Sequence, residues 1–359
     1  MLNVLMIDLG RDYGGAEKVI ENLFFYDYSD INMHLVALKD TKFFNVIKSK
    51  NNNQNCMFIE NDKKKILKSL FKVKKYIEDN KIDIIHAHGV TSEIFGVLLS
   101  KMTKCKLVTT IHSRADFDTA NKMKGKTYCF IQKILLRYNK KYVVVSDSLN
   151  KFFISDMNAD STKIDIIING IKPLEKRKKR LNDIFTISTV GRLTPVKAHK
   201  KLIEALIELK KEDIKFKCII AGNGELEEEL KKLVDTNDMK NEIKFYGFVE
   251  DVRDVLDESN CLIIHSDMEG LPITLLEAMS YNIPIITHKV GGINGVINEK
   301  NGILMKKNNP DEIKDKIKFC MQNEKEARLR AKKAEIDFMN KYDISKFIKS
   351  YCELYENLQ

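Results

Sequence analysis

The sequence predicts an α/β protein built from two Rossmann-like domains. Its 359 residues exceed the size at which one hydrophobic core usually divides into two. Apolar residues make up 43% of the chain, which is enough for two cores. Short β-rich apolar runs alternate with longer amphipathic runs, a pattern typical of parallel sheets covered by helices.

The individual elements follow from this alternation. In the first half, strands are predicted at 2–8, 33–39, 83–88, 106–112, 141–146 and 164–169, and helices at 15–26, 63–79, 92–103 and 123–138. In the second half, strands are predicted at 185–192, 216–222, 242–247, 261–266 and 284–290, and helices at 199–212, 224–236, 251–258 and 272–281. The remaining segment, 310–359, reads as helical.

A charged segment marks the predicted boundary between the domains. Residues 173–183 are strongly basic and begin with Pro173, and a new strand follows them. We therefore predict a first domain at 1–172, a linker at 173–183 and a second domain at 184–340. The last residues, 341–359, are predicted as a terminal helix that packs back on the first domain.

Composition excludes several classes of protein. The seven cysteines are widely spaced without a C-x-x-C pair, which indicates reduced thiols and neither a disulfide framework nor a zinc site. The N-terminus lacks the pattern of a signal peptide, and no apolar run approaches the 18–20 residues that span a bilayer. We expect a cytoplasmic protein that can meet a membrane only at its surface.

The most informative motif is SDMEGLPITLLEAMSYNIPIIT at 266–287, which contains Glu269 and Glu277. A Gly-Leu-Pro turn between a strand and a helix places free N–H groups of the first helical turn at the strand end, where they can bind an anion. Glu277 would lie inside that helix, within reach of a ribose diol. A helical core alone does not explain two acids around this turn.

A second motif, VGRLTPVK at 190–197, supplies two cations. Arg192 ends a predicted strand, and Lys197 precedes the next helix. An arginine fork and a lysine point charge at this place can neutralise a diphosphate.

These motifs together resemble the retaining glycosyltransferases of family four, which have the GT-B fold of two Rossmann-like domains facing one another across a cleft. The resemblance covers nearly the whole chain. It rests on GGAEKVIENL (14–23), DIIHAHG (83–89), TTIH (109–112), VVVSDSL (143–149), INGI (168–171), VGRL (190–193), AGNGELEEEL (221–230), YGFVEDV (246–252), EGLPITLLEA (269–278) and VGG (290–292).

The resemblance implies that the first domain binds an acceptor and the second a nucleotide-sugar donor. Arg192 and Lys197 would neutralise the donor diphosphate, Glu277 would hold the ribose, and Glu269 would face the transferred sugar. The main chain of the turn would contact the sugar hydroxyls and the phosphate, through Gly270, Leu271, Pro272, Ile273 and Thr274.

Other roles follow from the same resemblance. His112 would contact the sugar near the reaction centre, and Val249 would border the nucleobase. Gly14 and Gly15 would let the first loop approach the diphosphate and the acceptor. His86 and His88 fit the family's pattern at a strand end, but a buried structural role is an equal alternative for both.

The implied reaction moves a sugar, with retention of configuration, from a nucleotide donor that we expect to be UDP-linked to a glycan or lipid-linked acceptor of a cell-surface polysaccharide. Attack on the face that the leaving group departs is the expected mechanism, with Glu269 as a covalent nucleophile as the alternative. The two cations would replace a metal, so we expect no metal and no further cofactor.

Two positions depart from the family pattern. Ala198 follows Lys197 where the family usually has glycine, and Gly295 stands where an acidic residue is common.

The basic excess favours an anionic membrane surface as a partner. Residues 1–170 carry 27 basic and 19 acidic residues, whereas 181–359 carry 28 and 31. The predicted helices at 63–79 and 122–141 interleave lysines with apolar residues, as helices on anionic lipid do. We expect peripheral binding to the inner face of the cell membrane, although a solvated lysine-rich surface is an equal explanation of the charge.

Two other functions are compatible with the predicted fold. A nucleotide-sugar epimerase would share the fold, but the spacing of the acids and cations favours transfer. A basic Rossmann-like nucleic-acid-binding protein would explain the charge, but the sequence contains no recognised nucleic-acid module, so we expect no nucleic-acid partner.

Overall fold

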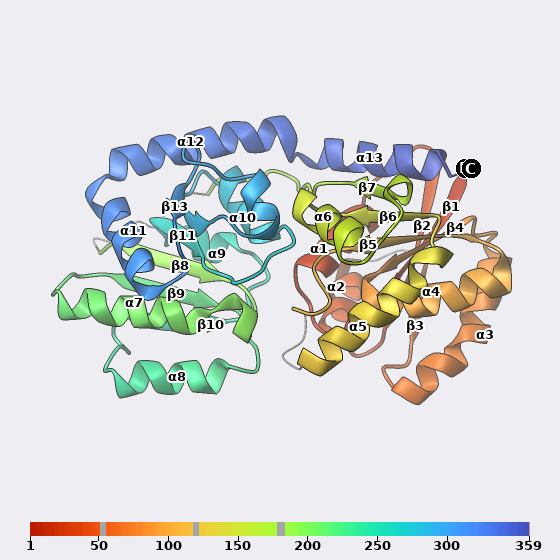
Figure 1. Ribbon diagram of the computed structural model, residues 1–359, viewed down its shortest axis with the longest axis horizontal. Helices are drawn as coiled ribbons and strands as arrows, with labels where there is room; N and C mark the ends of the chain where they lie inside the picture. The colour runs from red at the N-terminus through yellow and green to blue at the C-terminus, as the bar shows by residue number, and fades with distance from the viewer. Residues whose placement is uncertain (51–54, 118–121, 178–183, 359) are drawn as a thin grey trace. The chain divides into compact units, whose positions relative to one another are not determined.

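The computed structural model describes residues 1–50, 55–117, 122–177 and 184–358 and divides the chain into two compact units, whose elements are labelled in Figure 1. Unit 1 contains Met1–Gly170 and the residues from Ser345 onward, and unit 2 contains Ile171–Ile344. The C-terminal helix is thus part of the same unit as the N-terminal half. Much of the predicted linker, 178–183, lies outside the described residues.

Unit 1 is a parallel sheet whose strands follow the order β3-β2-β1-β4-β5-β6-β7 within the described part of the chain. Its strands are β1 (Leu2–Asp8), β2 (Ile31–Leu38), β3 (Cys56–Ile59), β4 (Ile84–His88), β5 (Lys106–Ile111), β6 (Lys141–Val144) and β7 (Ile164–Ile166). Its helices are α1 (Gly15–Phe24), α2 (Lys42–Lys50), α3 (Lys63–Asp79), α4 (Gly89–Thr103), α5 (Lys122–Leu135), α6 (Asp147–Ser155) and α13 (Ile344–Glu356), with short 3-10 turns η1 (Leu136–Tyr138) and η2 (Ser161–Lys163).

The alternation of side chains along β4 separates the two faces of this sheet. Ile85 and Ala87 belong to a core cluster with residues of α3, α4 and α5. Successive strand residues point to opposite faces, so His86 and His88 face the other side. There the side chains of Tyr351 and Tyr355, from α13, contact His86.

Unit 2 repeats the plan with the order β10-β9-β8-β11-β12-β13 among its described strands. Its strands are β8 (Thr186–Val190), β9 (Lys217–Ala221), β10 (Ile243–Gly247), β11 (Cys261–Ile264), β12 (Ile285–His288) and β13 (Ile303–Met305). Its helices are α7 (His199–Lys211), α8 (Glu227–Thr236), α9 (Arg253–Leu256), α10 (Ile273–Ser280), α11 (Pro310–Gln322) and α12 (Glu324–Lys341), with 3-10 turns η3 (Pro195–Lys197) and η4 (Gly291–Gly295).

The main core of unit 2 lies between the sheet and one layer of helices. Residues of α7, α8 and α11 pack there against buried side chains of β8, β9 and β11. β11 is buried along its whole length, as expected for a central parallel strand with both faces covered. The alternating apolar runs of the sequence are therefore explained by two doubly covered parallel sheets, and the predicted α/β class is confirmed.

All eleven predicted strands are present, and the sequence missed β3 and β13, which have four and three residues. Helices α2 and α6 were also missed. α6 does carry a recognisable start, because the Ser146 hydroxyl accepts a hydrogen bond from the Leu149 N–H (3.3 Å) as an N-cap. None of the helices in the described ranges has the length and apolarity needed to cross a membrane.

Candidate active site

The candidate site of unit 2 lies where the strand order reverses. β8 and β11 are paired neighbours in the sheet, although β9 and β10 separate them along the chain. The loop after β8 leads to α7 and carries Arg192 and Lys197, and the loop after β11 leads to α10 and carries Glu269. Open α/β sheets bind their ligands at such a reversal, outside the carboxyl ends of the strands.

Lys197 and Glu269 form an ion pair between these two loops. The lysine Nζ lies 2.6 Å from the glutamate Oε1, and the side chains are 20% and 8% exposed. The sequence assigned the two residues to different parts of a donor and gave no sign that they touch. The structure brings them together because the loops after neighbouring strands meet at one edge of the sheet.

Arg192 is held by hydrogen bonds of the residues on either side of it. The Gly191 N–H donates to the Ala221 carbonyl (2.9 Å), and the N–H of the fully buried Leu193 donates to the Asn223 carbonyl (2.9 Å). Arg192 itself is half-buried. Its backbone is therefore fixed by the end of β9 and by the residues that follow this strand.

Gly291 supports the backbone of Glu269. It has φ +50°, and a Cβ there would lie 1.7 Å from the Glu269 carbonyl oxygen. The next N–H, of Gly292, donates to that same oxygen (3.4 Å). The η4 loop thus packs directly on the main chain that presents Glu269, which explains the first glycine of the VGG motif.

Helix α10 begins one residue later than the sequence suggested. Pro272 is its N-cap, with φ −69° and ψ 132°, and no side chain caps the first turn. Ile273 and Leu271 are buried, whereas Thr274 and Glu277, one turn apart, are half-buried. The first turn therefore presents main-chain N–H groups and the Thr274–Glu277 face, and the apolar members serve as packing residues.

The residues at and after the end of β10 lie next to β9, to which this strand is paired. Gly247 closes this strand at φ +67°. Val249 then packs, with Val190 and Tyr246, on the small buried cluster of Ile219, Ala221 and Val255, as part of one apolar group. This places Val249 beside the end of β8.

Ala198 occupies a left-handed backbone conformation, with φ 55° and ψ 30°, between η3 and α7. This conformation costs a non-glycine residue about 1–2 kcal/mol. It occurs at the position where the family pattern usually has glycine. Ala198→Gly is expected to raise the free energy of unfolding by about 0.5–1 kcal/mol, because relief of this strain exceeds the loss of one methyl group. Urea unfolding measures the change, and a lower stability in the variant would contradict it.

Three histidines that the sequence did not single out lie beside these loops, namely the buried His199 and His265 and the half-buried His288. The rings of His199 and His265 pack edge to face at 5.1 Å, and His199 Nε2 contacts the Arg192 carbonyl (3.2 Å). One ring nitrogen each of His199, His265 and His288 is buried without a hydrogen-bond partner among the described residues. Burial lowers the pKa of all three, that of His199 to about 4, so they pack as neutral rings.

In unit 1, a chain of polar side chains runs from α13 to the carboxyl end of the sheet. The Tyr355 hydroxyl lies 2.6 Å from His86 Nδ1, and Thr110 Oγ1 lies 2.7 Å from His86 Nε2. The ring of His86 packs at a tilt against that of His88, whose Nδ1 lies 3.0 Å from His112 Nε2. Both ring nitrogens of His86 are thus engaged by Tyr355 and Thr110, which favours the structural alternative for His86. His88 is the histidine that contacts His112 directly.

The Gly14-Gly15 segment begins α1 without backbone strain. Gly14 is the N-cap in an extended conformation (φ −157°), and its N–H donates to Glu17 Oε2 (2.8 Å) in a capping box. A Cβ at Gly14 would meet only that carboxylate oxygen, at 3.7 Å. The structure alone therefore does not require glycine at 14, and the predicted approach of a ligand would have to supply the reason.

Burial of the imidazoles predicts that acid weakens the fold. Burial lowers the pKa of His86 to about 3 and of His112 to about 4, whereas an unfolded histidine titrates near 6.5. Below pH 6.5 the unfolded chain takes up protons that the folded chain does not bind. The contribution of these histidines to the free energy of unfolding therefore has its full value above pH 6.5 and decreases toward pH 4. Urea unfolding at pH 7.5 and 5 measures this, with His199→Asn expected to give a shallower fall; equal wild-type stability at both values would contradict it.

Comparisons with known proteins identify the family of this chain. A family model described as Glycosyl transferases group 1 matches residues 171–337, and one described as Glycosyltransferase Family 4 matches 13–173. A glycosyltransferase of Methanocaldococcus jannaschii is 30% identical over 287 residues, which are 75% of this chain and 73% of the relative. The chain belongs to the group 1 glycosyltransferases.

Two further comparisons add detail to this glycosyltransferase. An Escherichia coli UDP-Gal:alpha-D-GlcNAc-diphosphoundecaprenol alpha-1,3-galactosyltransferase is 25% identical over 309 residues, 81% of this chain and 79% of that one. The solved structure of Anabaena Alr3699/HepE with UDP-glucose has a TM-score of 0.87 at 19% identity and covers 99% of this chain and 100% of its own. The structural likeness shows the GT-B fold.

Most of the donor residues predicted for this glycosyltransferase lie in unit 2, on the loops described above. Arg192, Lys197 and Glu269 lie on the two loops that follow β8 and β11. Gly14, Gly15 and His112 lie in unit 1. No group of three or more metal-ligating side chains occurs in the described ranges.

Proposed function

We propose that this glycosyltransferase transfers a sugar from a UDP-linked donor to a glycan or lipid-linked acceptor in polysaccharide synthesis. The observation that carries the proposal is that two cations and the N-terminus of a helix without a side-chain cap follow neighbouring strands of one sheet. Arg192, Lys197 and the first turn of α10 all follow strands that end at the reversal of the unit 2 sheet. The UDP-dependent galactosyltransferase and the UDP-glucose complex among the similar proteins support UDP as the carrier.

The donor would be held by charge and by main-chain groups. Arg192 and Lys197 would neutralise the diphosphate, and the N–H groups at the start of α10 would bind phosphate oxygens. Glu277, half-buried in the second turn, would accept hydrogen bonds from the ribose hydroxyls. Val249 would contact the base. In unit 1, we propose that His112 contacts the transferred sugar and that the Gly14-Gly15 loop binds the acceptor.

We propose that configuration is retained by attack from the face that the leaving group departs. The anomeric carbon–phosphate oxygen bond breaks, the acceptor oxygen bonds to the anomeric carbon, and the acceptor proton passes to the departing phosphate. The ion pair with Lys197 favours this mechanism over a covalent one, because a paired carboxylate at Glu269 is a weaker nucleophile. Lys197 would bridge the carboxylate and the diphosphate.

The two cations would also make a metal unnecessary. Preorganised positive charge stabilises a developing diphosphate without solvent reorganisation, which is the contribution that a divalent ion would otherwise supply. We therefore propose that transfer continues in the presence of a chelator.

A thermal-shift panel of nucleoside diphosphates and their sugars tests the donor. UDP and one UDP-sugar are expected to raise the melting temperature most, since a ligand at a hundred times its Kd stabilises by about 2.7 kcal/mol. Glu277→Ala should weaken the shift, whereas the exposed Glu229→Ala should leave it unchanged. A panel in which no nucleotide stabilises the protein would refute the proposal.

We also propose that unit 1 binds an anionic membrane surface through α3 and α5. Exposed apolar side chains on these helices support this, with Phe71 at 73%, Met123 at 80% and Phe130 at 66% exposure. On α5, exposed lysines such as Lys126 and Lys133 interleave with them. Co-sedimentation with anionic but not with neutral vesicles is the expected result, and equal recovery with both would contradict it.

A further inference from the structure

Helix α12 of unit 2 presents an exposed stripe that contains both cations and large apolar side chains. We define the α12 stripe as Lys325, Arg328, Leu329, Lys332, Ile336 and Met339, which recur at spacings of three and four residues and so share one face. Leu329, Ile336 and Met339 are 69%, 46% and 50% exposed. Exposure of three such side chains on one helix face indicates an interaction surface.

The opposite face explains why the stripe has no packing role. Ala327, Ala331, Ala334 and Phe338 are buried and alternate with the stripe along the helix. α12 packs through these mostly small residues, with α10 as its main neighbour. The stripe therefore faces away from the unit's own core.

The stripe itself contains no acid, and the acids beside it are already paired. Glu324 pairs with Arg328 (2.5 Å), and Asp337 pairs with Lys333 (2.6 Å). Glu326 and Glu335 pair with Arg330 and Lys176. Within the described part of the chain, no acidic side chain pairs with Lys325 or Lys332, so the stripe carries uncompensated positive charge.

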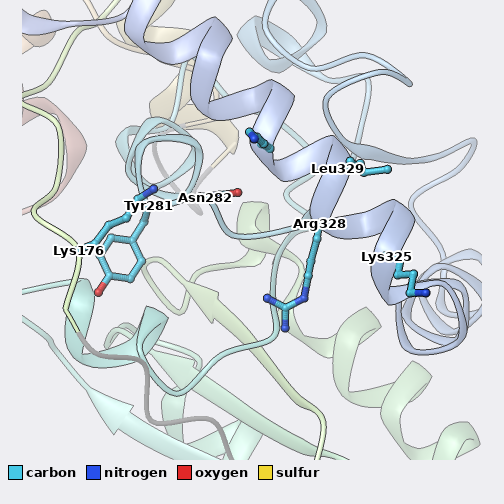
Figure 2. A pocket seen from close by; sticks show the side chains of 7 residues that line it. Lys176, Tyr281, Asn282, Lys325, Arg328 and Leu329 are labelled. Atoms are coloured by element: carbon cyan, nitrogen blue, oxygen red, sulfur yellow. The ribbon is translucent and has the colours of Figure 1, made fainter.

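A groove adjoins this stripe. It has a volume of about 590 Å³ and is lined by Lys176, Tyr281 and Asn282 on one side and by stripe residues on the other. Figure 2 shows Arg328, Leu329 and Lys325 on the helix and Lys176 and Tyr281 across from them. The groove is thus bordered by ammonium and guanidinium groups, with an apolar residue at its rim.

We propose that the α12 stripe docks on an anionic phospholipid membrane, with the groove receiving a phosphate headgroup. Lysine is depleted in protein–protein interfaces, whereas helices that lie on anionic lipid combine lysine or arginine with exposed apolar side chains. The apolar residues would enter the acyl boundary and the cations would neutralise headgroups. This contact is separate from the proposed one in unit 1 and adds to the proposed function a second membrane-facing surface.

Vesicle co-sedimentation of the full chain tests the proposal. Lys325→Ala/Lys332→Ala and Leu329→Ser/Ile336→Ser/Met339→Ser are each expected to lower the fraction bound to phosphatidylglycerol-containing vesicles at least threefold. The control Lys215→Ala/Lys232→Ala removes two exposed cations elsewhere in unit 2 and should bind like the wild type. The UDP-induced thermal shift should be the same in all of them.

The other outcomes are distinct. Unchanged vesicle binding in both stripe variants overturns the inference, and the unit 1 contact is judged separately from Phe71→Ser/Phe130→Ser. Equal binding of the wild type to anionic and neutral vesicles overturns both membrane contacts but leaves the donor proposal, which rests on the thermal shift. A wild type that dimerises in sedimentation equilibrium, with a monomeric stripe variant and unchanged vesicle binding, would assign the stripe to a second copy of the chain instead.

Discussion

Replacement of Arg192 and Lys197 together by alanine is expected to lower kcat about 10³-fold or more. Removing one preorganised donor from a developing oxyanion typically costs 10²–10³ in rate, and this variant removes both cations from the proposed leaving-group site. Initial rates of sugar transfer at saturating donor measure the effect. Lys210→Ala, which removes a cation of α7 that pairs with Glu242 (3.2 Å), is the matched control and should retain wild-type turnover.

The ion pair adds a second, separable consequence. Without Lys197, the Glu269 carboxylate, 8% exposed, loses its partner, and breaking such a pair costs on the order of 3 kcal/mol. Lys197→Met combined with Glu269→Gln should recover much of that stability without recovering turnover. Full turnover in the Arg192/Lys197 variant would contradict the proposed role of the two cations at the diphosphate. If the Lys197→Met/Glu269→Gln replacement does not recover stability, the ion pair is not the cause of the stability loss.

Gly291→Ala is expected to lower the free energy of unfolding by more than about 3 kcal/mol and to abolish transfer. The left-handed φ of +50° already costs alanine about 1–2 kcal/mol. The new Cβ would also lie 1.7 Å from the Glu269 carbonyl oxygen, so the main chain of one of the two loops must move. Displacement of that loop would shift Glu269 away from Lys197.

Gly295 provides the control for this variant. A Cβ there meets no atom within 4 Å, and the residue is exposed. Gly295→Ala should therefore change the stability by less than about 0.5 kcal/mol. Urea unfolding and transfer rates of the two variants measure the contrast, and similar losses in both would show that the close approach at Gly291 is unimportant.

Periodicity in the sequence was sufficient for most of the architecture. The central strand β11 is recognisable from the sequence because both of its faces are buried and each of its residues is apolar. The edge strands β3 and β13 were missed because three or four residues are too few to establish a period. Helix α6 was not predicted, although serine, the residue at its N-cap position 146, is a common N-cap residue.

The candidate site was predicted less completely than the fold. Motif resemblance located Arg192, Lys197 and Glu269, but it could not show that Lys197 contacts Glu269, since 72 residues separate them. The sequence also left open whether the histidines at the end of β4 are ligands or buried packing residues, because the answer depends on which helix covers them. For His86 that helix is α13, which lies 269 residues away at the level of Tyr355.

The participation of α13 in unit 1 has a consequence for biosynthesis. Unit 2 is one continuous stretch, Ile171–Ile344, whereas unit 1 needs residues from both ends of the chain. A ribosome therefore releases everything required for unit 2 before it releases Tyr351 and Tyr355, which contact His86 in the core of unit 1. The domain that is synthesised first is thus the one that is completed last, and until then β4 and β5 lack the helix that covers their histidine and threonine side chains.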